Sequence, residues 1–145
     1  MRIPDTLLIA PCPFGAKLPG ARVGEAIAEG VRAAGMPAPD VCPIEDPLRG
    51  SALGRALAEM GFDARMRRAR AVVVAAWRLD RDTLPQSAAF EIATRARQAG
   101  VPAYAVAGKS GLDAFDARLL DLQLILEAQN ARGLSAAGLE LARLT

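Results

Sequence analysis

Short apolar runs alternate with longer amphipathic segments along this chain, and that alternation constrains the fold more than any other feature. The runs are Thr6 to Ala10, Pro39 to Ile44, Ala71 to Ala76, Pro102 to Ala107 and Leu122 to Ala128. In the segments between them, apolar residues recur at helical spacing. Strands that alternate with helices form βαβ units and a parallel sheet. The pattern therefore predicts an α/β fold, a Rossmann-like open and mainly parallel sheet of about five strands with helices on both faces.

The run that contains Val72, Val73 and Val74 is expected to form the middle strand of that sheet. These β-branched residues are consecutive and do not alternate with polar ones, as is typical of a parallel strand covered on both faces. Gly35 and Gly100 each follow an amphipathic segment, where glycines in the left-handed conformation commonly end helices. We therefore expect two of the helices to end at these glycines.

Size and composition favour one globular unit whose chemistry does not involve histidine. The chain has 145 residues, of which 52% are hydrophobic and 23% charged, and it shows no linker or internal repeat. We expect a single domain that spans residues 1–145. Histidine is absent, which excludes Ser-His-Asp and Cys-His nucleophiles, imidazole bases and the common zinc sites.

Charge and cysteine content argue against several classes of partner. The 18 basic and 16 acidic residues are spread along the chain, and the one basic cluster, at 65–70, is interpreted as a solvated helix end and not as a nucleic-acid site. No apolar run approaches the roughly 20 residues that span a bilayer. Cys12 and Cys42 are too few for a disulfide framework. We expect a cytoplasmic protein with neither nucleic-acid nor membrane partners.

Ligands of open α/β sheets bind beyond the carboxyl ends of the strands, so the loops there hold the candidate site residues. In the first loop, Gly15, Lys17 and Gly20 are placed where a phosphate could meet backbone amides at a helix N-terminus. The alternative is a turn shaped by proline and glycine with an exposed lysine. Cys12 in the same loop is either a nucleophile or, as we favour, a buried structural thiol.

The second loop, at 45–51, contains Glu45, Asp46 and Arg49. An acid at this position holds a ribose hydroxyl in nicotinamide-binding domains, but the glycine fingerprint that should precede it is missing. A dinucleotide site is therefore not expected. The other interpretation is an Asp-Pro turn with Ser51 as the N-cap of the next helix.

The third loop, at 77–87, is the richest in titratable groups, which are Asp80, Asp82, Arg78 and Arg81. Its carboxylates could serve a metal ion or a substrate hydroxyl, and its guanidiniums could bind an anion. The alternative is a salt-bridged turn in which Ser87 or Thr83 caps the following helix. Lys109, after the next strand, is either a useful cation or an exposed one.

Three stretches together resemble the type I glycerate kinase family, whose members phosphorylate glycerate with ATP and Mg²⁺. They are LLIAPCPFGAKLPGARVGEAIAEGVRAAG, VCPIEDPLRGS and VVVAAWRLDRDTLPQSAAFEIATRARQAGVPAYAVAG. The family has a similar α/β domain, with a second large domain inserted after the second stretch. Here only the segment 52–69 occupies that place, so the resemblance implies a reduced homologue.

The resemblance implies a role for each matching residue. Asp80 would orient or deprotonate the substrate hydroxyl, and Asp46 would help to hold Mg²⁺. Lys17, the second catalytic residue, would neutralise phosphate and carboxylate groups. The remaining substrate- and nucleotide-binding residues would be Arg78, Asp82, Lys109, Phe14 and Ser87. The implied ligands are a small organic acid and a nucleotide.

Several family positions are changed in this chain. The aspartate of the family's first loop aligns with Cys12, a glycine with Trp77, and a lysine with Ser87. Loss of that lysine removes a charge of the kind that neutralises transferring phosphates, and Trp77 fills space near a strand end. The chain is thus either a kinase or a catalytically inactive homologue that binds a ligand or another protein.

If the chain is an inactive homologue, we expect it to form a homodimer or to bind a partner chain. Such a protein could pair through an exposed sheet edge or through an alanine-rich helix face. The residues of that face are Ala88, Ala89, Ile92 and Ala96.

Overall fold

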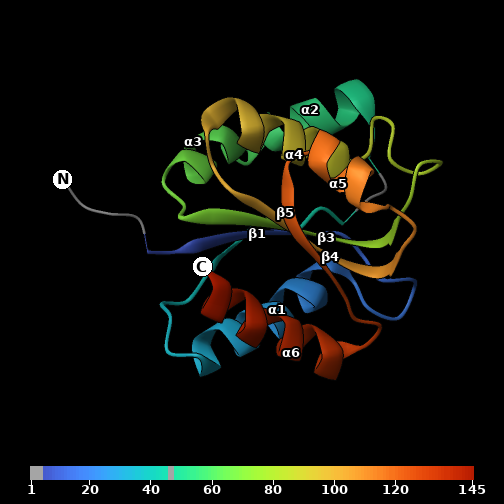
Figure 1. The fold of residues 1–145 in the computed structure, drawn as a ribbon. Helices are drawn as coiled ribbons and strands as arrows, with labels where there is room; N and C mark the ends of the chain where they lie inside the picture. The colour runs from blue at the N-terminus through green and yellow to red at the C-terminus, as the bar shows by residue number, and fades with distance from the viewer. Residues whose placement is uncertain (1–4, 46–47) are drawn as a thin grey trace.

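A computed structural model describes residues 5–45 and 48–145, and it contains the predicted parallel sheet. The strands are β1 (Leu7–Pro11), β2 (Asp40–Val41), β3 (Ala71–Leu79), β4 (Ala103–Ser110) and β5 (Leu122–Glu127). Their order in the sheet is β2-β1-β3-β4-β5, and each neighbouring pair is parallel (Figure 1). The α/β fold class is therefore confirmed, with the valine-rich β3 in the middle of the sheet.

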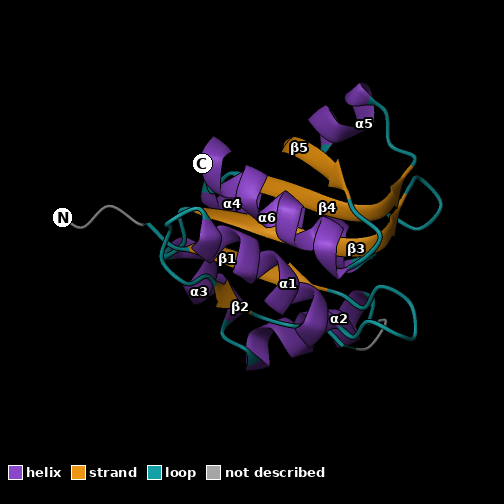
Figure 2. Ribbon diagram, turned by 90° about the horizontal axis from the view of Figure 1, so that it is seen from below, coloured by secondary structure: helices purple, strands orange, loops and turns teal. Residues whose placement is uncertain are grey.

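Helices cover both faces of the sheet (Figures 1 and 2). They are α1 (Gly20–Ala33), α2 (Gly50–Glu59), α3 (Phe62–Arg67), α4 (Ala88–Ala99), α5 (Ala114–Leu119) and α6 (Ala131–Leu144). The pair α1 and α6 lies on one face, and α2, α3 and α4 lie on the other, with α5 beside β5. Among the described residues, no helix combines the length and the apolarity needed to cross a membrane.

The sheet separates two hydrophobic cores, and β3 contributes to both. Val72 and Val74 pack toward α2, α3 and α4, whereas Val73 packs toward α1 and α6. This is the physical reason that its valines are consecutive, because both faces of a covered parallel strand are buried. Gly100 ends α4 with a φ of 71°, and Gly35 follows α1 with a φ of 89°, so the expected left-handed helix ends are confirmed.

The helices α1 and α6 approach each other closely because two glycines lie at their crossing. A Cβ atom at Gly30 would overlap the carbonyl oxygen of Ser135, and one at Gly138 would overlap that of Ile27. These obstacles are backbone atoms, which cannot rotate away as a flexible side chain can. The crossing therefore depends on the absence of side chains at both positions.

The strands differ in length from the sequence expectation. β3 continues through Leu79 and β4 through Ser110, because Arg78 pairs with Lys109 and Leu79 with Ser110 in the ladder. The apolar pattern ends before these residues and therefore predicts loops there. β2 is only two residues long. Ser51 lies inside α2, which begins at Gly50, so its predicted role as N-cap is wrong.

The alanine-rich face of α4 is not available to a partner. Ala88, Ala89, Ile92 and Ala96 are all buried in the core on the α2, α3 and α4 side of the sheet. The hypothesis that this face mediates pairing is therefore wrong. The apolar side of α4 packs against the chain's own sheet.

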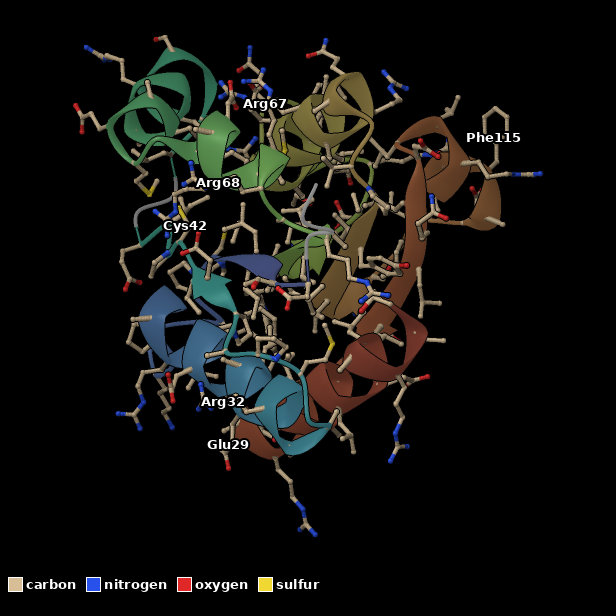
Figure 3. The ribbon with its side chains drawn as sticks, turned by 90° about the vertical axis from the view of Figure 1, so that its left-hand side faces the viewer. Glu29, Arg32, Cys42, Arg67, Arg68 and Phe115 are labelled. Carbon is tan, nitrogen blue, oxygen red and sulfur yellow. The ribbon has the colours of Figure 1, made fainter. Side chains whose placement is uncertain are left out.

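Part of the basic cluster at 65–70 is neutralised within the chain. The guanidinium of Arg65 donates two hydrogen bonds to the carboxylate of Asp40, at the start of β2. The hydrogen bond from Arg65 holds the pKa of Asp40 below its ordinary value. Arg67 and Arg68 follow at the end of α3, on the exposed surface (Figure 3), as expected for a solvated helix end.

Candidate functional site

The strand order creates a crevice between the carboxyl ends of β1 and β3. The chain passes from β1 to β2 on one side of β1 and then returns to β3 on the other side. In open α/β sheets, ligands bind at such a switch point. A pocket of about 390 Å³ lies there, between the loop after β1, the start of α2, the end of β3 and the start of α4. Its volume falls in the usual range of small-molecule sites, roughly 300–1,000 Å³.

Two arginines line this pocket, Arg49 and Arg78. Arg49 precedes α2 and donates hydrogen bonds to the carbonyl oxygens of Pro85 and Thr83, at 2.8 and 3.3 Å. It thereby ties the loop before α4 to the start of α2. Arg78 extends from the end of β3, and its guanidinium contacts the Asp80 carboxylate at 2.9 Å. Among the described contacts, Arg49 thus binds backbone carbonyl groups, whereas Arg78 binds a side-chain carboxylate.

Asp80 holds the turn after β3 together. One of its carboxylate oxygens accepts hydrogen bonds from the amide and the hydroxyl of Thr83, at 2.9 and 3.0 Å, and the other accepts from Arg78. The backbone amide of Thr83 lowers the pKa of Asp80, and the Thr83 hydroxyl and Arg78 lower it further. A carboxylate with a depressed pKa is a weak base, so this arrangement favours a structural role over proton abstraction.

The N-terminus of α1, where a phosphate was expected, already holds an anion from the chain itself. The Glu45 carboxylate accepts hydrogen bonds from the amides of Gly20 and Ala21, at 2.6 and 3.1 Å. Gly20 and Lys17 do not line the switch-point pocket, and Lys17 is exposed. A phosphate could reach these amides only by displacing Glu45. Local sequence signals do not predict this contact, because Gly20 and Glu45 lie 25 residues apart.

Replacing Glu45 by glutamine is expected to lower the free energy of unfolding by about 1 kcal/mol, because it removes the negative charge that caps α1. The measurement is urea unfolding followed by circular dichroism. Glu29→Gln is the matched control, since Glu29 is exposed on the same helix (Figure 3) and should change stability little. Equal stability of the two variants would show that Glu45 does not cap the helix in solution.

Cys12 lines the pocket, but its thiol is not activated. Burial, and to a lesser extent the nearby Glu45 carboxylate, raises its pKa to about 11. At neutral pH the side chain is therefore a neutral thiol, which supports the structural interpretation over the nucleophile.

Alkylation of Cys12 by iodoacetamide at pH 7.5 is expected to be about a hundredfold slower than that of an ordinary exposed cysteine, because only the thiolate reacts. The rate should rise with pH toward the raised pKa of about 11. Peptide mass spectrometry separates Cys12 from Cys42, and the same peptide from chain unfolded in urea provides the reference. Rapid labelling of folded chain at neutral pH would contradict the neutral thiol.

Trp77 lies on the opposite face of the sheet from the pocket. A Cβ atom at Gly108 would overlap its indole ring, which therefore covers this glycine, and its ring meets that of Phe14 edge to face with 5.6 Å between centroids. Phe14 is buried in the core against α1 and α6. Trp77 thus fills space beside the end of β4, as expected, but it does not line the pocket. Phe14, a predicted binding residue, does not line the pocket.

The other predicted site residues are dispersed. Ser87 lines the pocket but also caps α4, where its hydroxyl accepts from the amide of Phe90 and donates to the Leu84 carbonyl. Asp82 and Lys109 are exposed and do not line the pocket. Asp46, the predicted metal ligand, lies outside the described residues. The structure thus brings together Arg78 and Ser87, with Asp80 beside them, and adds Arg49, which had no predicted role as a ligand.

The described part of the pocket does not fit a magnesium ion. Mg²⁺ prefers carboxylate and other oxygen ligands in octahedral geometry. Within residues 5–45 and 48–145, no carboxylate lines the pocket, and no group of three or more Cys, Asp or Glu side chains is placed to hold a metal ion. Asp80, the nearest acid to Arg78 in sequence, uses both carboxylate oxygens within the turn.

Comparison with known proteins relates the chain to one enzyme family. The sequence model of the glycerate kinase family matches residues 48–137, which include β3, α4 and β4 and exclude the loop after β1. No curated protein matches. The fold is similar to the crystal structure of a response regulator receiver domain from Rhodospirillum rubrum, with a TM-score of 0.53 and 15% identity over 96% of this chain and 92% of that one.

Proposed function

Because this chain belongs to the glycerate kinase family, we propose that its switch-point pocket binds a small hydroxy acid such as glycerate. The observation that carries this proposal is the presence of Arg49 and Arg78 in one pocket whose described lining contains no carboxylate. In its described part the lining carries two guanidinium groups, one of them paired with Asp80 at 2.9 Å, so a net positive charge remains there. A carboxylate ligand would neutralise it.

Arg78 is the main partner proposed for the ligand's carboxylate. A planar guanidinium can donate two parallel hydrogen bonds to a carboxylate. Arg78 shares its guanidinium only with Asp80 among the contacts described above, whereas Arg49 already donates to two carbonyl groups. The contact with Asp80 also fixes the direction of the Arg78 side chain before a ligand arrives.

Two further features of the pocket suit an anion that carries a hydroxyl. The residues at the start of α4, Ser87 and Ala88, line the pocket, so the positive end of the helix dipole adds to the field of the arginines. The hydroxyls of Ser87 and Thr83 both donate within the chain, to the Leu84 carbonyl and the Asp80 carboxylate. Each keeps acceptor capacity for the hydroxyl of a bound acid.

We propose that this chain binds the acid without phosphorylating it. The family's reaction uses ATP and Mg²⁺, and the described donors do not fit the metal. No lysine is among the described lining residues, and Ser87 stands where the family's lysine is aligned. Asp80, which would be the base, has a lowered pKa. Ligand binding by a catalytically inactive homologue is therefore the function best supported here.

Titration calorimetry with glycerate, ATP and Mg²⁺, singly and combined, tests this proposal. We expect glycerate to bind alone, with an affinity that ATP and Mg²⁺ leave unchanged, and we expect no ADP in a coupled assay. Absence of glycerate binding at millimolar concentration would refute glycerate itself as a ligand of the pocket. ADP formation that depends on glycerate and is lost in Asp80→Asn would refute the proposed inactivity.

A further inference from the structure

The lining of the switch-point pocket is predominantly apolar. Four of its described residues are polar or charged, namely Arg49, Arg78, Thr83 and Ser87, and the other ten are apolar or glycine. Alanines at the end of β3 and the start of α4, which are Ala76, Ala88 and Ala89, leave space that longer side chains would fill. Ile44, Leu48, Leu79 and Leu84 form the remaining aliphatic wall.

The few polar groups of this pocket are already engaged within the chain. Arg49 donates to two carbonyl groups, and the hydroxyls of Thr83 and Ser87 each donate to an acceptor of the same turn. A ligand with one carboxylate and one hydroxyl can be matched by Arg78 and one of these hydroxyls. A further hydroxyl that lies against the aliphatic wall, beyond the reach of both Thr83 and Ser87, would lose its water without gaining a partner, which weakens binding.

From this lining we infer that the acid bound by the pocket is a 2-hydroxy acid with a branched aliphatic body, in preference to glycerate. The inference rests on the acid site proposed above and names its ligand class. The carboxylate binds at Arg78, and the aliphatic body packs against the wall formed by Leu48, Leu79 and Leu84. In glycerate, a terminal hydroxyl would face this wall, whose leucine side chains cannot form a hydrogen bond with it.

A series of acids that differ only beyond the 2-hydroxyl tests the inference by calorimetry. The compounds are glycerate, lactate and 2-hydroxyisocaproate, which end in a hydroxymethyl, a methyl and an isobutyl group. We expect 2-hydroxyisocaproate to bind at least tenfold more tightly than glycerate, because its extra carbons are removed from water. The amide of 2-hydroxyisocaproate should bind at least tenfold more weakly than the acid, because it lacks the charge that Arg78 binds.

Two apolar-to-asparagine variants locate the effect. Leu84→Asn, in the pocket wall, should remove most of the preference for 2-hydroxyisocaproate over glycerate. Phe115→Asn is the control, because Phe115 is 57% exposed on α5 and points away from the body of the molecule (Figure 3). It should leave the preference unchanged. Loss of the preference in Phe115→Asn instead would place the acid on the exposed surface and overturn the inference.

The outcomes separate this inference from the function on which it rests. Tighter binding of glycerate than of 2-hydroxyisocaproate would overturn the inference and leave the acid site standing. Failure of all three acids to bind would overturn both. Equal binding of 2-hydroxyisocaproate and its amide would also refute the acid site, because it would show that the pocket binds the isobutyl group without recognising the charge of the carboxylate.

Discussion

Replacement of Gly138 by alanine is expected to lower the free energy of unfolding by about 3 kcal/mol, a large part of the roughly 5–15 kcal/mol that stabilises a typical domain. The new methyl group would overlap the backbone carbonyl of Ile27, where α6 crosses α1. Neither backbone can yield without separating the two helices. Their separation would expose Ile27, Val31 and Leu141, which are fully buried between the helices and the sheet.

Gly54→Ala is the matched control for this variant. Gly54 also lies inside a helix, α2, but the nearest atom to an added Cβ would be a nitrogen of the flexible Arg95 side chain, at 4.0 Å. Alanine there should raise stability by about 0.5–1 kcal/mol, because it favours helix more than glycine does. Urea unfolding measures both. A Gly138→Ala variant as stable as Gly54→Ala would contradict the close crossing of α1 and α6.

Replacement of Arg78 by glutamine is expected to weaken the binding of glycerate or 2-hydroxyisocaproate by about ten- to hundredfold. A hydrogen bond to a charged group contributes about 1.5–3 kcal/mol, which corresponds to that range. The variant also leaves the Asp80 carboxylate without its guanidinium partner, so an uncompensated negative charge would lie beside the incoming acid. Both effects lower affinity, and titration calorimetry measures their sum.

Arg81→Gln controls for the loss of a positive charge from the same turn. The guanidinium of Arg81 pairs with Asp116 on α5, at 3.1 Å, and does not line the pocket. Its replacement should change acid affinity less than threefold, because water and salt screen the electric field of an exposed charge. Equal losses in the two variants would mean that Arg78 acts only through the net charge of the surface and makes no contact with the ligand.

The fold could be predicted from the sequence because each apolar run and each amphipathic segment corresponds to one element. The valines of β3 and the glycine after α4 are local signals of burial and of backbone conformation, and both predictions are confirmed. The ends of β3 and β4 could not be predicted. Arg78 and Lys109 belong to the ladder because neighbouring strands pair there, and their own side chains give no sign of it.

The site was predictable only where it depends on sequence-local chemistry. The placement of Arg78 near the carboxyl end of the middle strand and the capping role of Ser87 follow from nearby residues. The closure of the α1 N-terminus by Glu45, the anchoring of the 80–87 turn by Arg49 and the placement of Trp77 over Gly108 depend on segments distant in sequence. The face of the sheet that Trp77 occupies also depends on the register of β3, which the motif comparison does not reveal.

A crystal structure of the chain with bound 2-hydroxyisocaproate would test the central claim most directly, namely that the switch-point pocket is an organic-acid site. We predict that the carboxylate lies within hydrogen-bonding distance of the Arg78 guanidinium and that the isobutyl group contacts Leu84. An acid bound at the α1 N-terminus in place of Glu45, or one held in the pocket without contact to Arg78, would contradict the account.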